Sequence, residues 1–310
     1  MSELPPSASE APTAPAWGPF RTHLFVALQY ALPQHSLSRV VHRLARVRSG
    51  PAKNALIDAF VRHFRPEMHD AVETDPLRYD SFNAFFTRAL TPQARPVAPE
   101  AGAVASPVDG TVSQIGYLTD RSLLQAKGRE YTLDALLGHH DDWTQRLAGG
   151  AFATLYLAPY NYHRIHMPRA ATLRAAWYVP GRLFSVNTAT ASAVPNLFAR
   201  NERVVCAFEE EHPDHAPLCF AMVLVGALFV GSIATVWHGD VSPRNPRRPI
   251  DLPAAGPRLT LERGAEMGRF NMGSTVILLF PRDSVAWLPR LSAGSRIRMG
   301  EPLAALRAHP

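Results

Sequence analysis

Residues 218–237 read LCFAMVLVGALFVGSIATVW, twenty consecutive residues without a charged side chain. An apolar stretch of that length can cross a bilayer as a single helix. Gly226 and Gly231 divide it, however, and its content of β-branched residues is high. Ser232 and Thr235 place polar side chains inside it. Two buried strands joined near the glycines fit this pattern better than the alternative, a transmembrane helix.

The sequence on either side of this stretch predicts more strands. Alternating or short apolar runs, bounded by turn residues, are typical of strands in a β-rich core. They occur at 110–118, 152–158, 204–208, 220–225, 229–236 and 275–280. We therefore expect residues 108–310 to form a β-rich domain.

The first ninety residues have a different texture. Residues 1–16 are rich in Pro, Ala and Ser and are predicted to be a disordered tail. Helical spacing of apolar residues then predicts helices from Trp17 to Pro33 and over 37–47, followed by 55–64 and 79–90. Residues 91–107 contain four prolines and are expected to be a linker. The predicted fold class is α+β, with N-terminal amphipathic helices in residues 17–90 followed by the β-rich core.

The charge of the chain is unevenly distributed. The formal net charge of the 310 residues is +6. No acidic residue occurs between Glu10 and Asp58, whereas six basic residues do, so that the remainder of the chain is neutral. Basic amphipathic helices bearing Trp17 and other aromatic residues suit the surface of an anionic membrane. The alternative is ordinary packing of these helices with a solvated basic face.

The two cysteines form no recognisable metal or redox motif. Cys206 and Cys219 have neither CxxC nor metal-ligand spacing, and the N-terminus shows no secretory signal. We expect two buried thiols in a reducing compartment, with a disulfide as the alternative.

Two histidines and an aspartate stand out as candidates for chemistry. His163 and His166 follow the apolar run 152–158. A metal site is not indicated, because no third ligand stands at a diagnostic spacing from them. Such a pair can supply a general base and a hydrogen-bonding partner. Asp109 lies in a Pro-x-Asp-Gly turn and is either an ordinary turn residue or the carboxylate that orients a histidine.

Gly273 and Ser274 directly precede the apolar run 275–280. A Gly-Ser pair before a strand is usually a turn, and the G-x-S-x-G pattern of α/β-hydrolases is absent. The unsubstituted glycine carbonyl is nevertheless open to attack by the hydroxyl of the next residue, which would convert the amide into an ester.

Several long stretches, taken together, resemble the pyruvoyl-dependent phosphatidylserine decarboxylases, specifically the bacterial membrane-associated branch. The resemblance extends from about residue 20 to residue 307. It is carried by 81–90 (SFNAFFTRAL), 106–116, 162–168 (YHRIHMP), 181–187 (GRLFSVN), 194–203 (VPNLFARNER), 225–237 and 266–280 (EMGRFNMGSTVILLF). Met272 replaces the usual leucine of the family's Leu-Gly-Ser-Thr motif, which preserves volume and apolarity.

This resemblance implies that Asp109, His166 and Ser274 form a self-processing triad. His166 would deprotonate Ser274, whose hydroxyl attacks the Gly273 carbonyl, while Asp109 holds the imidazole in its useful tautomer. Cleavage would leave a β chain of residues 1–273 and an α chain of residues 274–310, with Ser274 converted into an N-terminal pyruvoyl group. The two chains would form a heterodimer held together by strand pairing.

The same resemblance implies the reaction. The covalent pyruvoyl cofactor would form a Schiff base with phosphatidylserine, release CO2 and yield phosphatidylethanolamine, a step of phospholipid biosynthesis. His163 is the candidate proton donor, with His166 as the fallback. The expected location is the cytoplasmic face of the cell membrane, as a peripheral protein with no nucleic-acid partner and no metal.

Two other function classes are weaker alternatives. A hydrolase would use the same three residues without chain cleavage. A biotinyl or lipoyl carrier would explain residues 109–112 and 297–303, but it needs a lysine at a hairpin tip, and the chain's two lysines, Lys53 and Lys127, are elsewhere.

Overall fold

The computed structural model describes residues 19–126, 128–211, 217–228, 232–241, 248–253, 258–272 and 274–307. The predicted tail, Lys127 and Gly273 lie outside these ranges.

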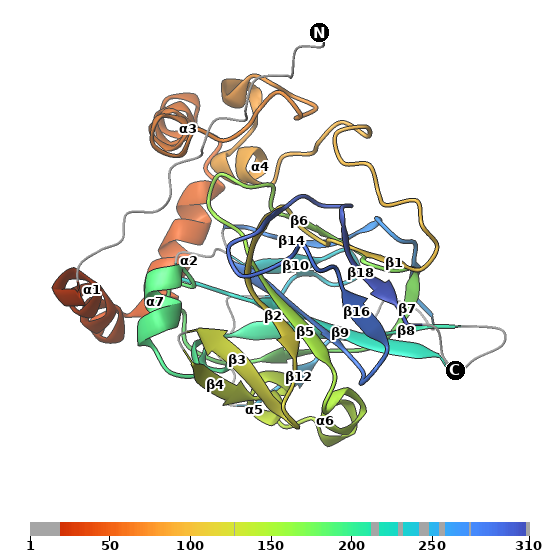
Figure 1. Ribbon diagram of the computed structural model, residues 1–310. Helices are drawn as coiled ribbons and strands as arrows, with labels where there is room; N and C mark the ends of the chain where they lie inside the picture. The colour runs from red at the N-terminus through yellow and green to blue at the C-terminus, as the bar shows by residue number, and fades with distance from the viewer. Residues whose placement is uncertain are drawn as a thin grey trace, which may run out of the picture.

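The N-terminal region is helical, as its apolar spacing predicted. Its helices are α1 (Pro19–Ala31), α2 (Gln34–Ala45), α3 (Gly50–Phe64) and α4 (Phe82–Phe86), with the short 3-10 helix η1 (Pro76–Arg78) before α4. Together they lie along one side of the sheets (Figure 1). Pro33 separates α1 from α2, because proline cannot donate the next backbone hydrogen bond. α4 is shorter than expected because the Ser81 side chain caps its first turn, accepting a hydrogen bond from the Ala84 amide.

Within the described ranges, nine strands form the central sheet. Its order is β12-β7-β8-β9-β15-β5-β2-β17, and β13 also pairs with β7. The strands in that order are β12 (Ile250–Asp251), β7 (Ala171–Val179), β8 (Arg203–Glu210), β9 (Leu218–Val225), β15 (Thr275–Phe280), β5 (Ala151–Tyr156), β2 (Gly110–Tyr117), β17 (Arg296–Ile297) and β13 (Thr260–Leu261). All of these pairings are antiparallel.

Smaller sheets and helices surround this one. One sheet has the order β11 (Gly239–Asp240), β10 (Ile233–Thr235), β14 (Glu266–Phe270), β6 (Arg164–His166); another has the order β1 (Ala103–Ala105), β18 (Pro302–Leu306), β16 (Val285–Trp287). The hairpin β3 (Ser122–Ala126) and β4 (Arg129–Thr132) leads into α5 (Leu133–Leu137) and α6 (Asp141–Leu147), and α7 (Thr188–Ala193) and α8 (Leu197–Arg200) precede β8. The stretch 218–237 thus contains strands β9 and β10, as predicted.

The hydrophobic core occupies both faces of the central sheet. In β15, Val276, Leu278 and Phe280 pack into one apolar cluster, and Ile277 and Leu279 into another. A strand buried on both faces needs a continuous apolar run instead of alternation, which explains the sequence TVILLF. A third cluster under the N-terminal helices joins α3 to α4 through buried Ile57 and the α4 phenylalanines.

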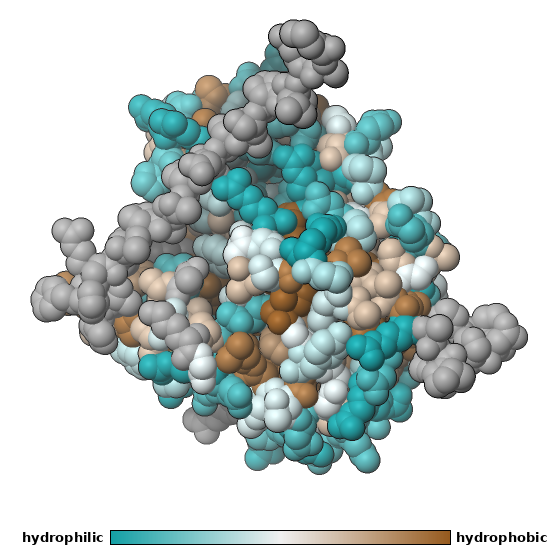
Figure 2. Space-filling model, viewed as in Figure 1, coloured by the Kyte–Doolittle hydropathy of each residue, from teal (hydrophilic) through white to brown (hydrophobic). Residues whose placement is uncertain are grey.

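The structure also shows how hydrophobic residues are distributed on one face and how deeply the two cysteines are buried. Figure 2 shows mostly hydrophilic residues around the rim of one face and hydrophobic residues near its middle, over the region of β2 and β5. Among the described residues, no helix combines the length and apolarity needed to span a bilayer. Cys206 is a buried free thiol, as expected, whereas the free thiol of Cys219 is only half-buried.

Candidate functional site

Asp109 lies at the start of β2, in the turn predicted from the sequence. The next residue must be small, since a side chain on Gly110 would meet the Tyr156 carbonyl oxygen of β5 at 2.4 Å. The buried Asp109 carboxylate accepts hydrogen bonds from Arg95 Nη2 at 2.7 Å and from the Met299 amide at 2.8 Å. Asp109 is therefore held firmly by a buried ion pair and a backbone amide.

His166 ends strand β6, next to the turn that carries Asp109. Its amide donates to the Pro107 carbonyl at 2.9 Å, which joins β6 to that turn. Its Nδ1 lies 2.8 Å from the Gly264 carbonyl oxygen and must carry the proton of that bond, so Nε2 accepts from the Tyr162 hydroxyl at 2.9 Å. Burial lowers the pKa of His166, which keeps the imidazole neutral and able to act as a base.

His163 is more deeply buried than His166. Its Nδ1 donates to the Asn161 carbonyl at 2.8 Å, and its ring lies 4.1 Å from the ring of Phe86 on α4. Nε2 is buried and has no hydrogen-bond partner among the described residues. Burial lowers the pKa of His163 to about 3, although the bond to Asn161 opposes this shift. A buried, neutral imidazole with one free nitrogen is ready to exchange a proton with a bound molecule.

Ser274 lies at the start of a strand in the middle of the central sheet. It directly precedes β15, and its carbonyl accepts from the Leu157 amide at 2.9 Å. Its Oγ is buried without a hydrogen-bond partner in the described part of the chain. A buried hydroxyl in that state loses its hydration without compensation.

The backbone just before Gly273 is strained. Met272 has a φ of 145°, in a region that residues other than glycine rarely adopt. The neighbouring Asn271 is fixed, because its side-chain amide donates to Asp240 Oδ1 at 2.9 Å. Since the Ser274 carbonyl is also fixed, the segment around Gly273 is anchored on both sides. Backbone strain of this kind costs about 1–3 kcal/mol and tends to occur at functional sites.

Two cavities adjoin these residues. An apolar cavity of about 370 Å³ is lined by residues that include Met272 and Leu157, together with Phe86, the ring that packs on His163. A second, strongly basic cavity of about 430 Å³ is lined by residues that include Asp109 and Tyr162. The apolar cavity could hold an acyl chain beside the start of β15.

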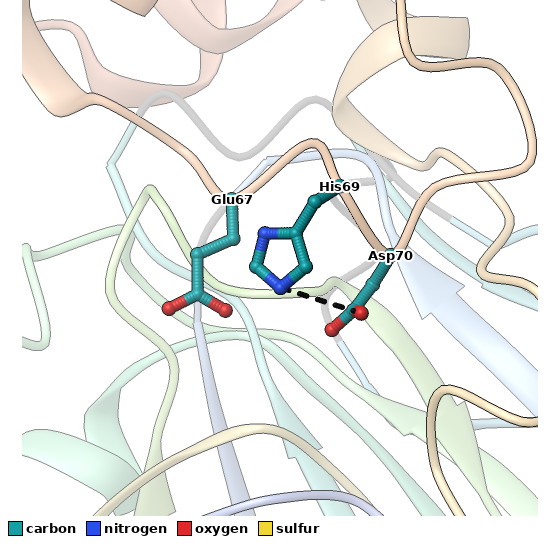
Figure 3. Close-up of side chains that lie close together, drawn as sticks. All are labelled: Glu67, His69 and Asp70. Carbon is teal, nitrogen blue, oxygen red and sulfur yellow. Dashed lines mark ion pairs between the residues drawn. The ribbon is translucent and has the colours of Figure 1, made fainter. Parts of the chain in front are cut away.

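Near the second cavity, Glu67, His69 and Asp70 lie close together (Figure 3). Their potential ligand atoms are within 4.8 Å of one another, and His69 Nε2 is 3.4 Å from Asp70 Oδ1. Asp70 is already paired with Arg95 Nη1 at 2.7 Å. The group is therefore better described as an extension of the Asp109–Arg95 ion pair than as a metal site.

The structure brings the predicted residues into one region without joining them directly. Among the hydrogen bonds of the described residues, none links Asp109, His166 and Ser274 to one another. The carbonyl of Gly264 receives the Nδ1 proton of His166, the contact expected of Asp109. Asp109 nevertheless acts on His166 through space, since its charge opposes the lowering of the histidine's pKa.

Sequence reasoning missed three features of this site. Arg95 lies in the proline-rich segment predicted as a linker, where nothing distinguishes a buried arginine from a solvated one. The backbone conformation of Met272 also has no local signature. Only Tyr162 offered a signal, because it lies four residues before His166 in the same short motif.

Comparison with known proteins identifies the family. The family model described as phosphatidylserine decarboxylase matches residues 82–305, and a second, described as PSD, matches residues 24–65. The phosphatidylserine decarboxylase proenzyme of Methylococcus capsulatus is 49% identical over 289 residues, which cover 93% of this chain and 98% of that protein. The Bordetella pertussis protein of the same name is 50% identical over 288 residues, covering 92% of this chain and 95% of its own length. The chain therefore belongs to the phosphatidylserine decarboxylase family.

Proposed function

We propose that this protein decarboxylates phosphatidylserine to phosphatidylethanolamine after cutting its own chain between Gly273 and Ser274. One observation supports this most strongly: the Ser274 hydroxyl is buried, has no partner among the described residues, and lies two residues beyond the strained Met272. Strain next to the scissile bond would be relieved when the bond breaks, and the unpaired hydroxyl would gain a covalent partner.

In the proposed cleavage, Ser274 Oγ attacks the Gly273 carbonyl carbon. The hydroxyl proton passes to His166 Nε2 and then to the Ser274 nitrogen, so that an ester replaces the peptide bond. To accept the Ser274 proton, His166 Nε2 must release the Tyr162 hydroxyl, with which it is hydrogen-bonded in this structure. Elimination across Cα and Cβ of Ser274 then frees the Gly273 carboxylate. Water hydrolyses the remaining enamine, releasing ammonia and leaving a pyruvoyl group at the N-terminus of the α chain.

Asp109 would support His166 electrostatically. Its carboxylate is tied to Arg95, so its influence reaches the imidazole through space, favouring the charged form that exists while the proton is in transit. The Gly264 carbonyl sets the tautomer of His166, because it accepts the hydrogen bond from Nδ1 of that imidazole.

The residues around Ser274 fit a covalent pyruvoyl cofactor. Three buried polar atoms there lack partners among the described residues: Ser274 Oγ, the neighbouring Thr275 Oγ1 and His163 Nε2. Such a group supplies an acceptor for the electron pair that is left when CO2 departs. The apolar cavity beside Met272 would take an acyl chain and exclude water from the reacting atoms.

His163 would return a proton to the substrate's α-carbon through Nε2. The imidazole is neutral at physiological pH, because burial lowers its pKa to about 3. A bound substrate carries a carboxylate and a phosphate, whose negative charges raise the pKa of a nearby imidazole. His163 would therefore acquire its proton as the substrate binds.

The N-terminal helices would hold the enzyme on the membrane. On α1, Leu24 and Leu28 are 60% and 56% exposed, and on α2 the side chains of Val40 and Leu44 are similarly exposed. These apolar side chains stand in a segment that has basic residues and no acidic ones. We infer peripheral attachment to the cytoplasmic face of the cell membrane, where anionic lipids attract such helices.

Replacing the proposed nucleophile tests the cleavage. Ser274→Ala should leave a single uncleaved chain of about the full 34.1 kDa and abolish decarboxylation of phosphatidylserine in vesicles. Ser284→Ala is a matched control, because Ser284 is also a buried serine of the predicted α chain but lies away from the site. Intact-mass measurement and CO2 release provide the readouts. A wild-type protein that stays uncleaved, or a Ser274→Ala variant that still releases CO2, would overturn the proposal.

A further inference from the structure

The basic cavity borders Asp109 and Tyr162 of the site described above, but most of its lining has no role in the proposed reaction. It opens at the C-terminal end of α3, has a volume of about 430 Å³ and contains two carboxylates in its lining, Glu67 and Asp109. Against these stand six arginines: Arg62, Arg65, Arg88, Arg95, Arg296 and Arg298. A concave surface with such an excess of positive charge attracts anions.

Some of this charge is neutralised within the protein. Arg95 is paired with both Asp109 and Asp70, and Arg298 Nη2 lies 3.5 Å from a Glu67 carboxylate oxygen. Among the ion pairs of the described residues, none includes Arg62, Arg65 or Arg88. Three guanidinium groups on the cavity wall are thus left without a carboxylate partner.

Arg88 is the most informative of the three. Its side chain is buried, with 3% exposure, and its charge lies over the ring of Phe85. Nη2 donates two long bonds, 3.3 Å each, to the carbonyls of Glu67 and Tyr160, while Nε has no partner in the described part of the chain. A buried guanidinium that is paired only with carbonyls is poorly compensated and would be stabilised by an anion.

We propose that this cavity binds a phosphate group, supplied either by an anionic lipid headgroup or by free phosphate in solution. Arginine suits this ligand because its planar fork donates two parallel hydrogen bonds to phosphate oxygens. A phosphate also carries enough charge to engage Arg88, Arg65 and Arg62 together, which a single carboxylate does less well.

The site is distinct from the apolar cavity at Met272. Phe64 lines both cavities and marks the boundary between them. The basic cavity contains neither Ser274 nor His163 in its lining. Although Asp109 and Tyr162 are in that lining, neither is assigned to the reacting headgroup, so the ligand proposed here is a second anion, held beside the helices that we assign to the membrane surface.

Charge-matched variants test this site. Arg62→Gln/Arg65→Gln removes two exposed charges from the cavity without disturbing the core, and Arg88→Gln removes the buried one. Arg121→Gln/Arg129→Gln is the control, since both arginines are exposed and lie at the β3–β4 hairpin, far from α3 in Figure 1. Binding of inorganic phosphate to the purified full-length protein is measured by titration calorimetry. Binding to phosphatidylcholine vesicles with and without phosphatidylglycerol is measured by sedimentation.

We expect the cavity variants to bind phosphate about tenfold more weakly, and the control pair to bind like the wild type. If the cavity variants lose only phosphate binding, free phosphate is the ligand. If their binding to phosphatidylglycerol vesicles also falls below that of the control pair, the ligand is the lipid headgroup. Should Arg88→Gln fail to fold, the exposed double variant alone decides. Cavity variants indistinguishable from the control pair in both assays would overturn the proposal, whether or not the chain cleaves itself.

Discussion

At the residue scale, the site is marked by polar atoms that are buried but unpaired. His163 Nε2 and Ser274 Oγ both lack partners among the described residues, as do several other buried side-chain atoms, Thr154 Oγ1 and Thr275 Oγ1 among them. Leaving such groups unpaired costs about 1–3 kcal/mol each. A folded protein retains that cost where the atoms serve a purpose, here the transfer of protons and the formation of a covalent bond.

Mutation can distinguish the roles of the two proposed proton-transfer residues, His163 and His166. His163→Ala should still produce two chains, because cleavage is assigned to His166, but should lose most decarboxylation of phosphatidylserine. A loss of about 10²–10⁴-fold is typical of a missing general acid or base. His139→Asn, which changes an exposed histidine between α5 and α6, is the control. Denaturing electrophoresis reports cleavage, and CO2 release reports turnover. Undiminished turnover would refute the assignment.

Burial of His163 also predicts a pH dependence of stability. Its pKa is about 3 in the folded protein and near 6.5 when unfolded, so below pH 6.5 the unfolded chain binds a proton that the folded chain refuses. Stability contributed by the neutral imidazole is complete above that pH and is lost as the pH falls toward 3. Between pH 7 and pH 5 the loss from this group should be about 2 kcal/mol.

Urea unfolding of the uncleaved Ser274→Ala chain checks this value. The double variant Ser274→Ala/His163→Phe lacks the titrating group and should lose about 2 kcal/mol less over the same pH interval. Equal losses in the two proteins would show that His163 is not buried as a neutral imidazole.

At the scale of single elements, α1, like α2, leaves apolar side chains exposed. Leu24 and Leu28 are spaced four residues apart and so share one face of the helix, and both are largely exposed. An exposed apolar face beside basic residues is the pattern of an interfacial helix.

Polar substitution of that face should weaken membrane binding. Leu24→Ser/Leu28→Ser is expected to lower the partition of the protein onto phosphatidylglycerol-containing vesicles by at least tenfold, because each buried leucine contributes about 1.5–3 kcal/mol. Leu124→Ser is the control, since Leu124 is 38% exposed on β3, away from the helices. The assay is vesicle flotation. Partition equal to that of the control would locate the membrane contact elsewhere.

At the scale of the whole molecule, the proposed α chain contributes strands to two sheets. Residues 274–310 contain β15, β16, β17 and β18. β15 pairs with β9 on one side and β5 on the other, β17 pairs with β2, and β18 pairs with β1. These partners all belong to the proposed β chain. A 37-residue segment is too short to keep this shape alone, so the two chains should remain one folding unit.

This arrangement predicts that cleavage does not separate the chains. Native mass spectrometry of the wild type should show both chains in one complex, whereas denaturing electrophoresis should show two. The α chain should dissociate only where the central sheet unfolds, because its strand β15 lies in the middle of that sheet. An α chain lost under native conditions would contradict this prediction.

The class of fold and most of its elements follow from local patterns in the sequence. The apolar runs of β9 and β15 and the helical spacing in the first sixty residues are local patterns, and local patterns are set by which side chains must be buried. The motifs around His163, His166 and Ser274 likewise indicated the family without any coordinates.

The contacts within the site, by contrast, depend on how distant parts of the chain pack together. Arg95 lies in a segment predicted as a linker, yet its side chain is buried against Asp109, and the Gly264 carbonyl, not Asp109, bonds to His166. The chain around Arg95 also includes β1, which pairs with β18 near the C-terminus. The buried Arg88 Nε, which has no partner among the described residues, and the strain at Met272 appeared only in three dimensions. The physical reason is that hydrogen bonding and desolvation depend on neighbours far away in the chain, which no local pattern specifies.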